Sequence, residues 1–350
     1  MKQFLSLQYL RAAAALGVVL FHFTHQKPLT DEAAGVFERG QFGVDLFFVL
    51  SGFIMQMSTS GREMAPAAFL GRRIARVAPL YWAATLAAAM IATDPALSFG
   101  LHADGRTLLS SLLFIPDWSP KTPGVIAPLL TVGWTLNLEM AFYALFALGL
   151  FLPVRLRLPL VGGVLAALGL AGLWIDTGNP AIEAYTNSAV IEFAYGMALA
   201  RFHESGALKG EGGEFLIAGG LGLALLVPFD LGWRGLTFGP AAAAIVAGFV
   251  LLDGKLVRRP VKAAKLLGDA SYSLYLTHGM ALASMALLLR KLGVEGPLAA
   301  IIAAEVAVAS LAAVVIYFAI ERPLTRAARR LADGRMAPSA RERRIFAGAG

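Results

Sequence analysis

The stretch 297–320, PLAAIIAAEVAVASLAAVVIYFAI, decides the fold class of this chain, because it holds a single ionisable residue, Glu305. A helix needs roughly 20 mostly apolar residues to cross the hydrocarbon core of a bilayer, and this stretch is long enough. Similar stretches recur along the chain, so the sequence predicts an all-α, polytopic membrane protein with about ten transmembrane helices. The predicted spans are residues 5–25, 42–58, 75–93, 133–152, 159–175, 181–200, 214–229, 236–252, 271–289 and 297–320.

The composition points the same way. Of the 350 residues, 57% are hydrophobic and 15% are charged, and the mean hydropathy is +0.67. An average soluble domain carries about 25% charged residues, so this chain has too few to cover a water-facing surface. A soluble enzyme, a disordered chain and a disulfide-stapled domain are therefore excluded. An outer-membrane barrel is disfavoured, because its strands would alternate in hydropathy. The absence of Cys excludes thiol catalysis and thiolate metal sites.

The basic residues predict the orientation in the membrane. With the N-terminus in the cytoplasm, 22 of the 30 Lys and Arg residues fall in cytoplasmic segments and seven in outer segments. Positive charge collects in cytoplasmic loops, so we expect both termini in the cytoplasm. The net charge of +7 then needs no nucleic acid as a partner. We expect one integral-membrane domain over residues 1–325, and a basic, disordered cytoplasmic tail over residues 326–350 that lies near anionic lipid headgroups.

Arg11 and His22 are ionisable residues eleven positions apart in the first predicted span. On an α-helix this spacing brings them to one face, roughly 16 Å apart along the axis. Ionisable groups inside a membrane are costly and are candidates for function, and imidazole is a common general base near neutral pH. The alternative is that Arg11 snorkels to the inner surface and His22 caps the outer end. His25 suggests a metal site with His22, but the helix carries no obvious third ligand, and we predict no metal.

Two carboxylates are predicted at the depth of His22, because Asp45 and Glu139 lie near the start of two spans that enter from outside. Either carboxylate could orient the imidazole and stabilise its protonated form. The alternative for each is a structural ion pair with an Arg or His residue. Interhelical hydrogen bonding explains the remaining buried ionisable groups adequately; these are Glu192, His278 and Glu305.

Three arginines, Arg72, Arg73 and Arg76, precede the third predicted span on its cytoplasmic side. Arg73 and Arg76 have the i,i+3 spacing that places two side chains on one face of a helix. Two guanidinium forks in register suit a phosphate group. The alternative is the ordinary positive charge of a cytoplasmic loop, and the spacing alone does not decide between the two.

Several short motifs follow one another along the chain. They are Arg11 with His22 in an R-x10-H pattern, GVDLFFVLSGF at 43–53, RIAR at 73–76 with PLYW at 79–82, WTLNLE at 134–139 with FY at 142–143, GDASYSLYLTH at 268–278 and ERP at 321–323. Together they resemble the membrane acyltransferase 3 family over residues 3–325. The opening QYLR at 8–11 is more similar to the exopolysaccharide O-acetyltransferase branch of that family, the ExoZ-like proteins.

The resemblance implies an enzyme of the bacterial inner membrane that moves an acyl group, usually acetyl from cytoplasmic acetyl-CoA, to a carbohydrate hydroxyl. The acceptor would be an exopolysaccharide or a related glycan, free or lipid-linked. Arg11 and His22 match the catalytic motif of the family. Arg73 and Arg76 match its donor-binding motif, and Glu139 matches a recurrent acidic position.

Topology and resemblance together suggest a mechanism. The phosphates of acetyl-CoA would bind the inner arginines, and its arm would thread between helices to His22. His22 would deprotonate the sugar hydroxyl or accept the acetyl group transiently, with Asp45 or Glu139 holding the imidazolium. The groups that would bind the donor phosphates are Arg11, Arg72, Arg73 and Arg76. The carbonyl oxygen, as charge develops on it, could accept a hydrogen bond from Asn137, Tyr81 or Tyr143.

Two other classes of protein remain open. A transporter or channel would use the same buried ionisable groups as a proton or ion path, although no inverted repeat is evident. A structural subunit of a polysaccharide export complex would tolerate the loss of His22 and Arg11.

Overall fold

The computed structural model describes residues 4–24, 35, 37–61, 63–93, 103–119, 122–228, 233–294 and 296–336. Over these residues the chain forms helices and loops, with one isolated β-bridge and no strand, so the predicted all-α class is confirmed. The main helices are α1 (Leu5–Thr24), α3 (Gly43–Thr59), α4 (Pro66–Ala92), α5 (Gly105–Leu112), α6 (Trp134–Gly149), α7 (Val154–Arg157), α8 (Gly163–Ala171), α9 (Pro180–Tyr185), α10 (Ile191–Ser205), α11 (Gly213–Leu226), α12 (Arg234–Val257), α13 (Lys262–Asp269), α14 (Ser271–Lys291), α15 (Leu298–Ile316) and α16 (Arg322–Met336). Shorter 3-10 or π turns are η1 (Arg39–Phe42), η2 (Thr131–Gly133), η3 (Leu158–Gly162), η4 (Ser188–Val190) and η6 (Tyr317–Glu321).

Eight helical segments within the described residues are long and apolar enough to cross a membrane. They are Leu5–Phe23, Arg39–Thr59, Pro66–Ala92, Thr131–Gly149, Val154–Ala171, Arg234–Val257, Ser271–Lys291 and Leu298–Asp333. The two further spans predicted at 181–200 and 214–229 correspond to the shorter helices α10 and α11. The side chains of Asn179 and Asn187 accept backbone hydrogen bonds at the starts of α9 and η4. Because such caps begin new helices, they divide this part of the chain into short pieces.

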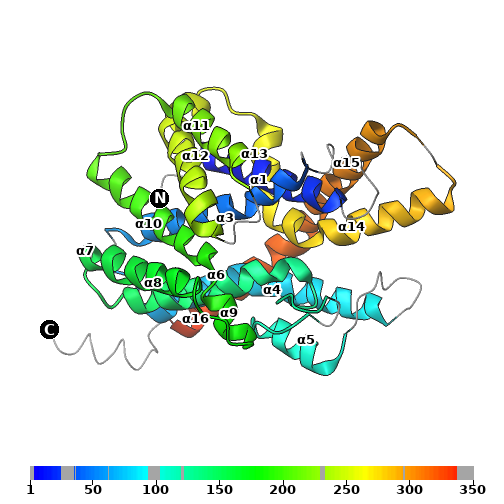
Figure 1. Cartoon of the computed structure of the whole chain (residues 1–350), viewed down its shortest axis with the longest axis horizontal. Coiled ribbons are helices and arrows are strands. Elements are labelled where there is room, and N and C mark those ends of the chain that lie inside the picture. Colours follow the sequence, from blue (N-terminus) through cyan, green and yellow to red (C-terminus); the bar gives the residue numbers. More distant parts are fainter. Residues whose placement is uncertain are drawn as a thin grey trace.

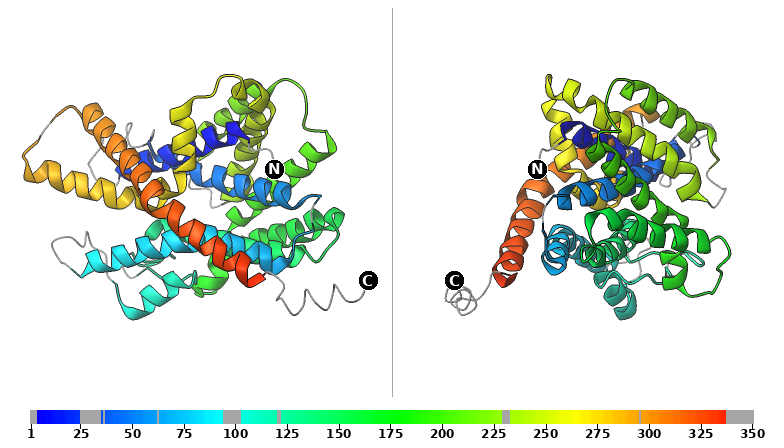
Figure 2. Two further views of the ribbon diagram at one scale, coloured as in Figure 1. Left: turned by 180° about the vertical axis from the view of Figure 1, so that it is seen from behind. Right: turned by 90° about the vertical axis from the view of Figure 1, so that its left-hand side faces the viewer.

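Helices α1 and α3 run through the middle of the bundle (Figure 1). Helices α12 and α11 pack on one side of them, and α4 and α6 lie on the other. Helices α14 and α15 form a hairpin that projects from one end, and α16 runs back along α4, as Figure 2 shows. The site described below therefore lies where α1, α3, α4, α6 and α14 meet.

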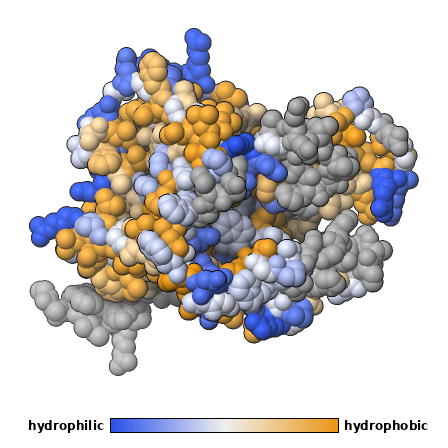
Figure 3. Space-filling model, in the orientation of Figure 1, coloured by the Kyte–Doolittle hydropathy of each residue, from blue (hydrophilic) through white to orange (hydrophobic). Residues whose placement is uncertain are grey.

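The outer surface is rich in large apolar side chains. Phe215 is 83% exposed and Leu226 is 81% exposed. Figure 3 shows apolar side chains over much of one face, with hydrophilic ones towards its margins and around a central recess. Exposed apolar area of this extent is typical of a surface that contacts lipid.

Helices α3 and α10 touch through their backbones at a pair of glycines. A Cβ atom on Gly52 would lie 2.1 Å from the carbonyl oxygen of Phe193, and one on Gly196 would lie 2.0 Å from that of Val49. Small residues allow such close approach between helices in a membrane. This contact holds α3 in place, and α3 supplies one wall of the site through Ser51, next to Gly52.

The C-terminal part of the described chain is a helix that continues α15 through the π turn η6. Glu321 in that turn is 1% exposed. The helix continues to Met336 and packs against α4, so residues 326–336 of the tail predicted as disordered are helical. An ion pair between Arg72 and Asp333, 3.0 Å long, joins the two helices. The rest of the tail, 337–350, lies outside the described residues.

Candidate active site

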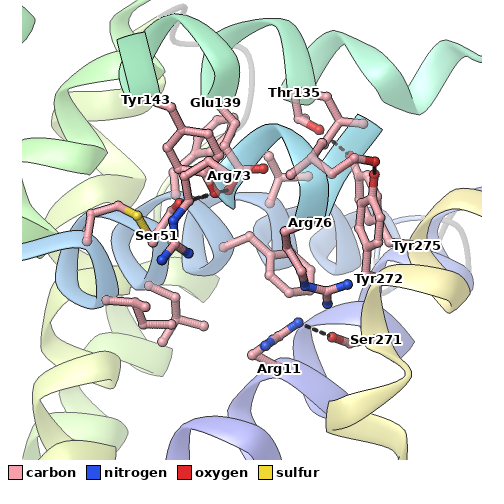
Figure 4. Close-up of a pocket in the computed structure, with 18 residues that line it drawn as sticks. Arg11, Ser51, Arg73, Arg76, Thr135, Glu139, Tyr143, Ser271, Tyr272 and Tyr275 are labelled. Carbon is pink, nitrogen blue, oxygen red and sulfur yellow. Dashed lines mark hydrogen bonds between the residues drawn. The ribbon is translucent and has the colours of Figure 1, made fainter. Parts of the chain in front are cut away.

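A cavity of about 180 Å³ lies between α1, α3, α4, α6 and α14. Figure 4 shows that its polar side chains point inward from all five helices. The polar and charged residues in its wall are Arg11, Ser51, Arg73, Arg76, Thr135, Glu139, Tyr143, Ser271, Tyr272 and Tyr275. A protein interior that collects three guanidinium groups, a carboxylate and several hydroxyls is a candidate functional site, because each of these groups is costly to bury in a membrane.

The cavity is elongated along α3. Val44 and Met55 both line it, and eleven residues of α-helix separate them by roughly 16 Å. In Figure 4, Ser51 and Arg73 lie towards one end, and Thr135 and Tyr275 lie towards the other. The long axis of the cavity therefore runs along the helices.

Glu139 is held by two hydroxyl groups. Ser51 on α3 donates a hydrogen bond to its Oε1 atom at 2.7 Å, and Tyr143, one turn along α6, donates to the same oxygen at 2.5 Å. Tyr143 is buried, and its hydroxyl lies 3.3 Å from that of Ser51. Hydrogen bonds to an ionised acceptor are stronger than neutral ones, so this arrangement fixes the carboxylate in the cavity wall.

Arg76 pairs with Glu321, although the two residues are 245 positions apart. Glu321 also accepts a hydrogen bond from Ser273 at 2.6 Å, and the Arg76 guanidinium lies 5.2 Å from the centre of the Tyr272 ring. Arg76 is therefore partly neutralised and stacked, and it joins α4 to α14 and η6.

Arg11 and Arg73 approach the cavity in different ways. Arg11 donates a hydrogen bond to Ser271 at 3.0 Å. Arg73 lies 5.4 Å from the centre of the Phe69 ring, and its Nε atom is buried with no hydrogen-bond partner in the described part of the chain. Since nearly all buried donors are paired, Arg73 is the cavity guanidinium best able to bind an added anion.

His22 lies at the opposite end of α1 from Arg11 and is absent from the cavity wall. Its Nδ1 atom lies 2.9 Å from the carbonyl oxygen of Val18. Its ring packs edge to face against His278 of α14, with the ring centres 4.7 Å apart. Tyr275 lines the cavity and lies 6.2 Å from His278, measured between ring centres, so α14 links the cavity to the two imidazoles.

The sequence profile of the Acyltransferase domain family matches residues 4–320. The chain belongs to the membrane acyltransferase 3 family. The exopolysaccharide production protein ExoZ of Rhizobium meliloti (strain 1021) is 38% identical over 298 residues, which cover 84% of this chain and 92% of ExoZ. The acyltransferase MdmB of Streptomyces mycarofaciens is 29% identical over 312 residues, which cover 79% of this chain and 78% of MdmB. No solved structure gives a significant match.

The family resemblance predicted from the motifs is thus confirmed, and this chain is an acyltransferase. Its apolar helices make it a multi-pass membrane protein. Guanidinium and hydroxyl groups are mixed along this cavity: Arg73 lies near Ser51 and Tyr143, whereas Arg11 contacts Ser271 and Arg76 contacts Tyr272 (Figure 4). The volume of 180 Å³ is below the roughly 300–1,000 Å³ of pockets that enclose a whole ligand. It is large enough for part of an acyl donor rather than for a whole ligand.

The structure brings five of the predicted site residues into one cavity: Arg11, Arg73, Arg76, Glu139 and Tyr143. Five others are absent from the residues that line it: His22, Asp45, Arg72, Tyr81 and Asn137. Arg72 and its partner Asp333 are both about half exposed. Tyr81 is fully buried, with its ring centre 4.8 Å from that of Phe114.

Asp45 is held by an arginine that the sequence analysis did not connect with it. Arg234 at the start of α12 donates hydrogen bonds of 2.7 and 2.6 Å to its two carboxylate oxygens, and two further bonds to Gln41. Asp45 is fully buried. This geometry agrees with the alternative of a structural ion pair, which joins α3 to α12.

Several residues near the site carried no role in the sequence analysis. Ser51, Tyr272 and Tyr275 lie inside the quoted motifs at 43–53 and 268–278, so the motifs held the only signal for them. Arg329 of α16 lies close enough to Arg72, Arg73 and Arg76 to interact with them electrostatically. The sequence analysis placed Arg329 only among the basic residues that predict the orientation in the membrane, because nothing in the local sequence shows that α16 folds back onto α4.

A metal site has no support in the described part of the chain, where no group of three or more His, Asp and Glu side chains could hold an ion. His25, the second member of the predicted His pair, lies outside the described residues.

Proposed function

We propose that this protein is an O-acetyltransferase that moves acetyl from cytoplasmic acetyl-CoA to a carbohydrate hydroxyl of an exopolysaccharide or related glycan, free or lipid-linked. The observation that carries the proposal is the elongated cavity with Arg11, Arg73, Arg76 and Glu139 in its wall. The similarity to ExoZ, an exopolysaccharide production protein, supports the class of acceptor.

The proposed topology has ten spans and both termini in the cytoplasm of a bacterium, with the chain in the inner membrane. It adds α10 and α11 to the eight long apolar segments. The first turn of α1 and the last turn of α16 lie towards the same end of the bundle, which supports this topology (Figure 1). In this orientation Arg73 faces the cytoplasmic end of the cavity and His22 lies nearer the outer surface. Residues 1–325 then form one catalytic domain, and the basic residues beyond it contact anionic lipid.

On the donor side, the phosphates of acetyl-CoA bind the guanidinium groups at the inner end. Arg73 is the leading candidate, since its buried Nε atom has no hydrogen-bond partner among the described residues. Arg11 and Arg76 add charge from the cavity wall, and Arg72 and Arg329 add charge from the neighbouring surface. Tyr81 supports α4 from its buried position rather than touching the donor.

On the chemical side, His22 takes the proton of the sugar hydroxyl as the oxygen attacks the thioester carbonyl, or accepts the acetyl group transiently. Glu139, with Tyr143 and Ser51 bonded to it, lines the path of the donor arm. We assign the catalytic role among the carboxylates to Glu139. Asp45 instead fixes α12 through Arg234.

The test uses inverted membrane vesicles from a strain that makes its own surface polysaccharide, because their outer face is the cytoplasmic one. Labelled acetyl-CoA is added outside, and label in the glycan is measured. We expect His22→Ala to abolish incorporation while the purified variant still binds acetyl-CoA. His203→Ala on α10 is the matched control and should behave like the unaltered protein. Unchanged incorporation by His22→Ala would refute the proposal.

Mass spectrometry of the surface polysaccharide separates the remaining classes of protein. An acetyltransferase adds an acetyl group to the repeat unit, and this group disappears when the protein is removed. A transporter or an export subunit predicts less polysaccharide, or none, with the acetyl content of the repeat unchanged.

A further inference from the structure

His22 has a second imidazole as its neighbour, and this pairing points to a role for His278. The two rings come from α1 and α14 and meet edge to face, with centres 4.7 Å apart and planes inclined at 61°. His278 is fully buried. The carboxylates that the sequence offered as partners for His22 are bonded elsewhere, Glu139 to Ser51 and Tyr143, and Asp45 to Arg234.

The hydrogen bonds of the two rings define their tautomers. The Nδ1 atom of His22 lies 2.9 Å from the carbonyl oxygen of Val18, and that of His278 lies 3.1 Å from the carbonyl oxygen of Leu274. A carbonyl oxygen only accepts, so Nδ1 is the donor in both rings. In a neutral imidazole the other nitrogen, Nε2, then carries a lone pair. Each ring therefore presents Nε2 as its basic atom.

The Nε2 atom of His278 is buried and has no hydrogen-bond partner within the described residues. Buried polar atoms are nearly always paired, and an exception calls for an explanation. A lone pair held next to a general base becomes useful once that base has taken a proton, because the new N–H needs an acceptor.

We propose that His278 is a positioning residue for His22, whose Nε2 atom accepts a hydrogen bond from the protonated His22 during acyl transfer. This inference rests on the proposed function. As the hydroxyl O–H bond breaks, its proton moves to Nε2 of His22, and the oxygen forms the new bond to the acyl carbon. The C–S bond then breaks, and the same proton passes from His22 to the sulfur to give the free thiol of CoA. Between the two steps the Nε2–H of His22 is shared between the substrate and Nε2 of His278, and His278 is itself neither consumed nor charged at the end.

A neutral partner suits this location. A carboxylate buried beside His22 would need its own compensating charge before the reaction begins, since an unpaired buried charge is strongly unfavourable. An imidazole carries no charge at rest and still accepts a hydrogen bond from the imidazolium.

The position of His278 is set from the cavity side by Tyr275, three residues before it on α14. The Tyr275 hydroxyl lies 2.9 Å from that of Thr135 and donates to the carbonyl oxygen of Val132 at 3.1 Å. These bonds tie Tyr275 of α14 to α6 and to the turn before it. The helix thus presents Tyr275 to the cavity and His278 to His22.

Two near-isosteric variants test the proposal. The amide nitrogen of His278→Asn can replace the Nδ1 donor to Leu274 but leaves no acceptor at the position of Nε2. His278→Gln places an amide oxygen near that position. In the inverted-vesicle assay with labelled acetyl-CoA, we expect Asn to lower kcat by about 10²-fold or more with KM for acetyl-CoA unchanged. We expect Gln to retain most of the rate.

The outcomes separate this proposal from the proposed function. If His22→Ala is inactive but His278→Asn keeps its kcat, the role of His278 is refuted and the proposed function stands. The same conclusion follows if kcat falls equally in His278→Asn and His278→Gln. If His22→Ala remains active, the proposed function itself fails. Thermal unfolding of each purified variant shows whether it folds. His203→Asn on α10 is the matched control and should leave kcat unchanged.

Discussion

Substitution of the two arginines of the RIAR motif should affect different properties of the protein, although the two residues lie one turn apart and line the same cavity. Arg73 has a buried Nε atom without a hydrogen-bond partner among the described residues, whereas Arg76 is paired with the buried Glu321. We therefore expect Arg73→Met to affect donor binding and Arg76→Met to affect folding.

For Arg73, the magnitude follows from what the side chain does in each state. Without the donor, Arg73→Met loses only the contact with the Phe69 ring, worth about 0.5–1 kcal/mol. With the donor, it loses a charged hydrogen bond to phosphate worth about 1.5–3 kcal/mol. Since each 1.4 kcal/mol is tenfold, KM for acetyl-CoA should rise by roughly 10- to 150-fold.

For Arg76, the substitution leaves Glu321 buried and unpaired. The Arg76 side chain is 24% exposed and that of Glu321 is 2% exposed, so the pair is poorly screened by water. Removing one partner of a buried ion pair costs about 3–5 kcal/mol. The double variant Arg76→Met with Glu321→Gln should recover most of this loss, because the orphaned charge is then gone.

The assays are thermal unfolding of the purified protein in detergent and KM for acetyl-CoA in inverted vesicles. Arg258→Met, at an exposed position after α12, is the matched control and should change neither quantity. The reasoning is refuted if Arg73→Met lowers stability as much as Arg76→Met, or if it leaves KM within about twofold of the unaltered protein.

Three further predictions follow from the contacts around the site. Glu139→Gln should lower kcat by about 10²-fold while the protein still folds, as measured by vesicle assay and thermal unfolding; an unchanged kcat would remove Glu139 from the chemistry. Arg234→Met should destabilise the protein by about 3–5 kcal/mol, and the double variant Arg234→Met with Asp45→Asn should recover much of the melting temperature. If the double variant melted as low as Arg234→Met alone, the pairing of the two residues would be contradicted. Gly52→Ala should reduce folded yield, because its Cβ would lie 2.1 Å from the Phe193 carbonyl oxygen; normal yield would show that α3 and α10 can separate.

The membrane fold was predictable because each span is a local property of the sequence. A run such as 297–320 crosses a bilayer by its length and apolar character, whatever lies around it. Which residues share one face of a helix is also a local property, because it depends on their spacing. Arg11 and His22 both lie on α1, and Arg73 and Arg76 both lie on α4 and line one cavity.

The number of spans was harder to predict for the region 181–229. Its apolar residues predict two spans, and the structure has two helices there, α10 and α11, of 15 and 14 residues. Hydropathy reports composition over a window, but the ends of a helix depend on single capping residues such as Asn187.

What the sequence determined by itself is the class of the protein, the family to which it belongs and the pairs of residues that share one helix, because these depend on residue type and on the 3.6-residue turn. Only the tertiary structure decided which helices meet. It paired Asp45 with Arg234, Arg76 with Glu321 and His22 with His278, over separations of 189 residues or more. The physical reason is that helix-to-helix contacts depend on close packing of small residues and on burial of polar groups. The local sequence of one helix does not identify the helix that it will meet.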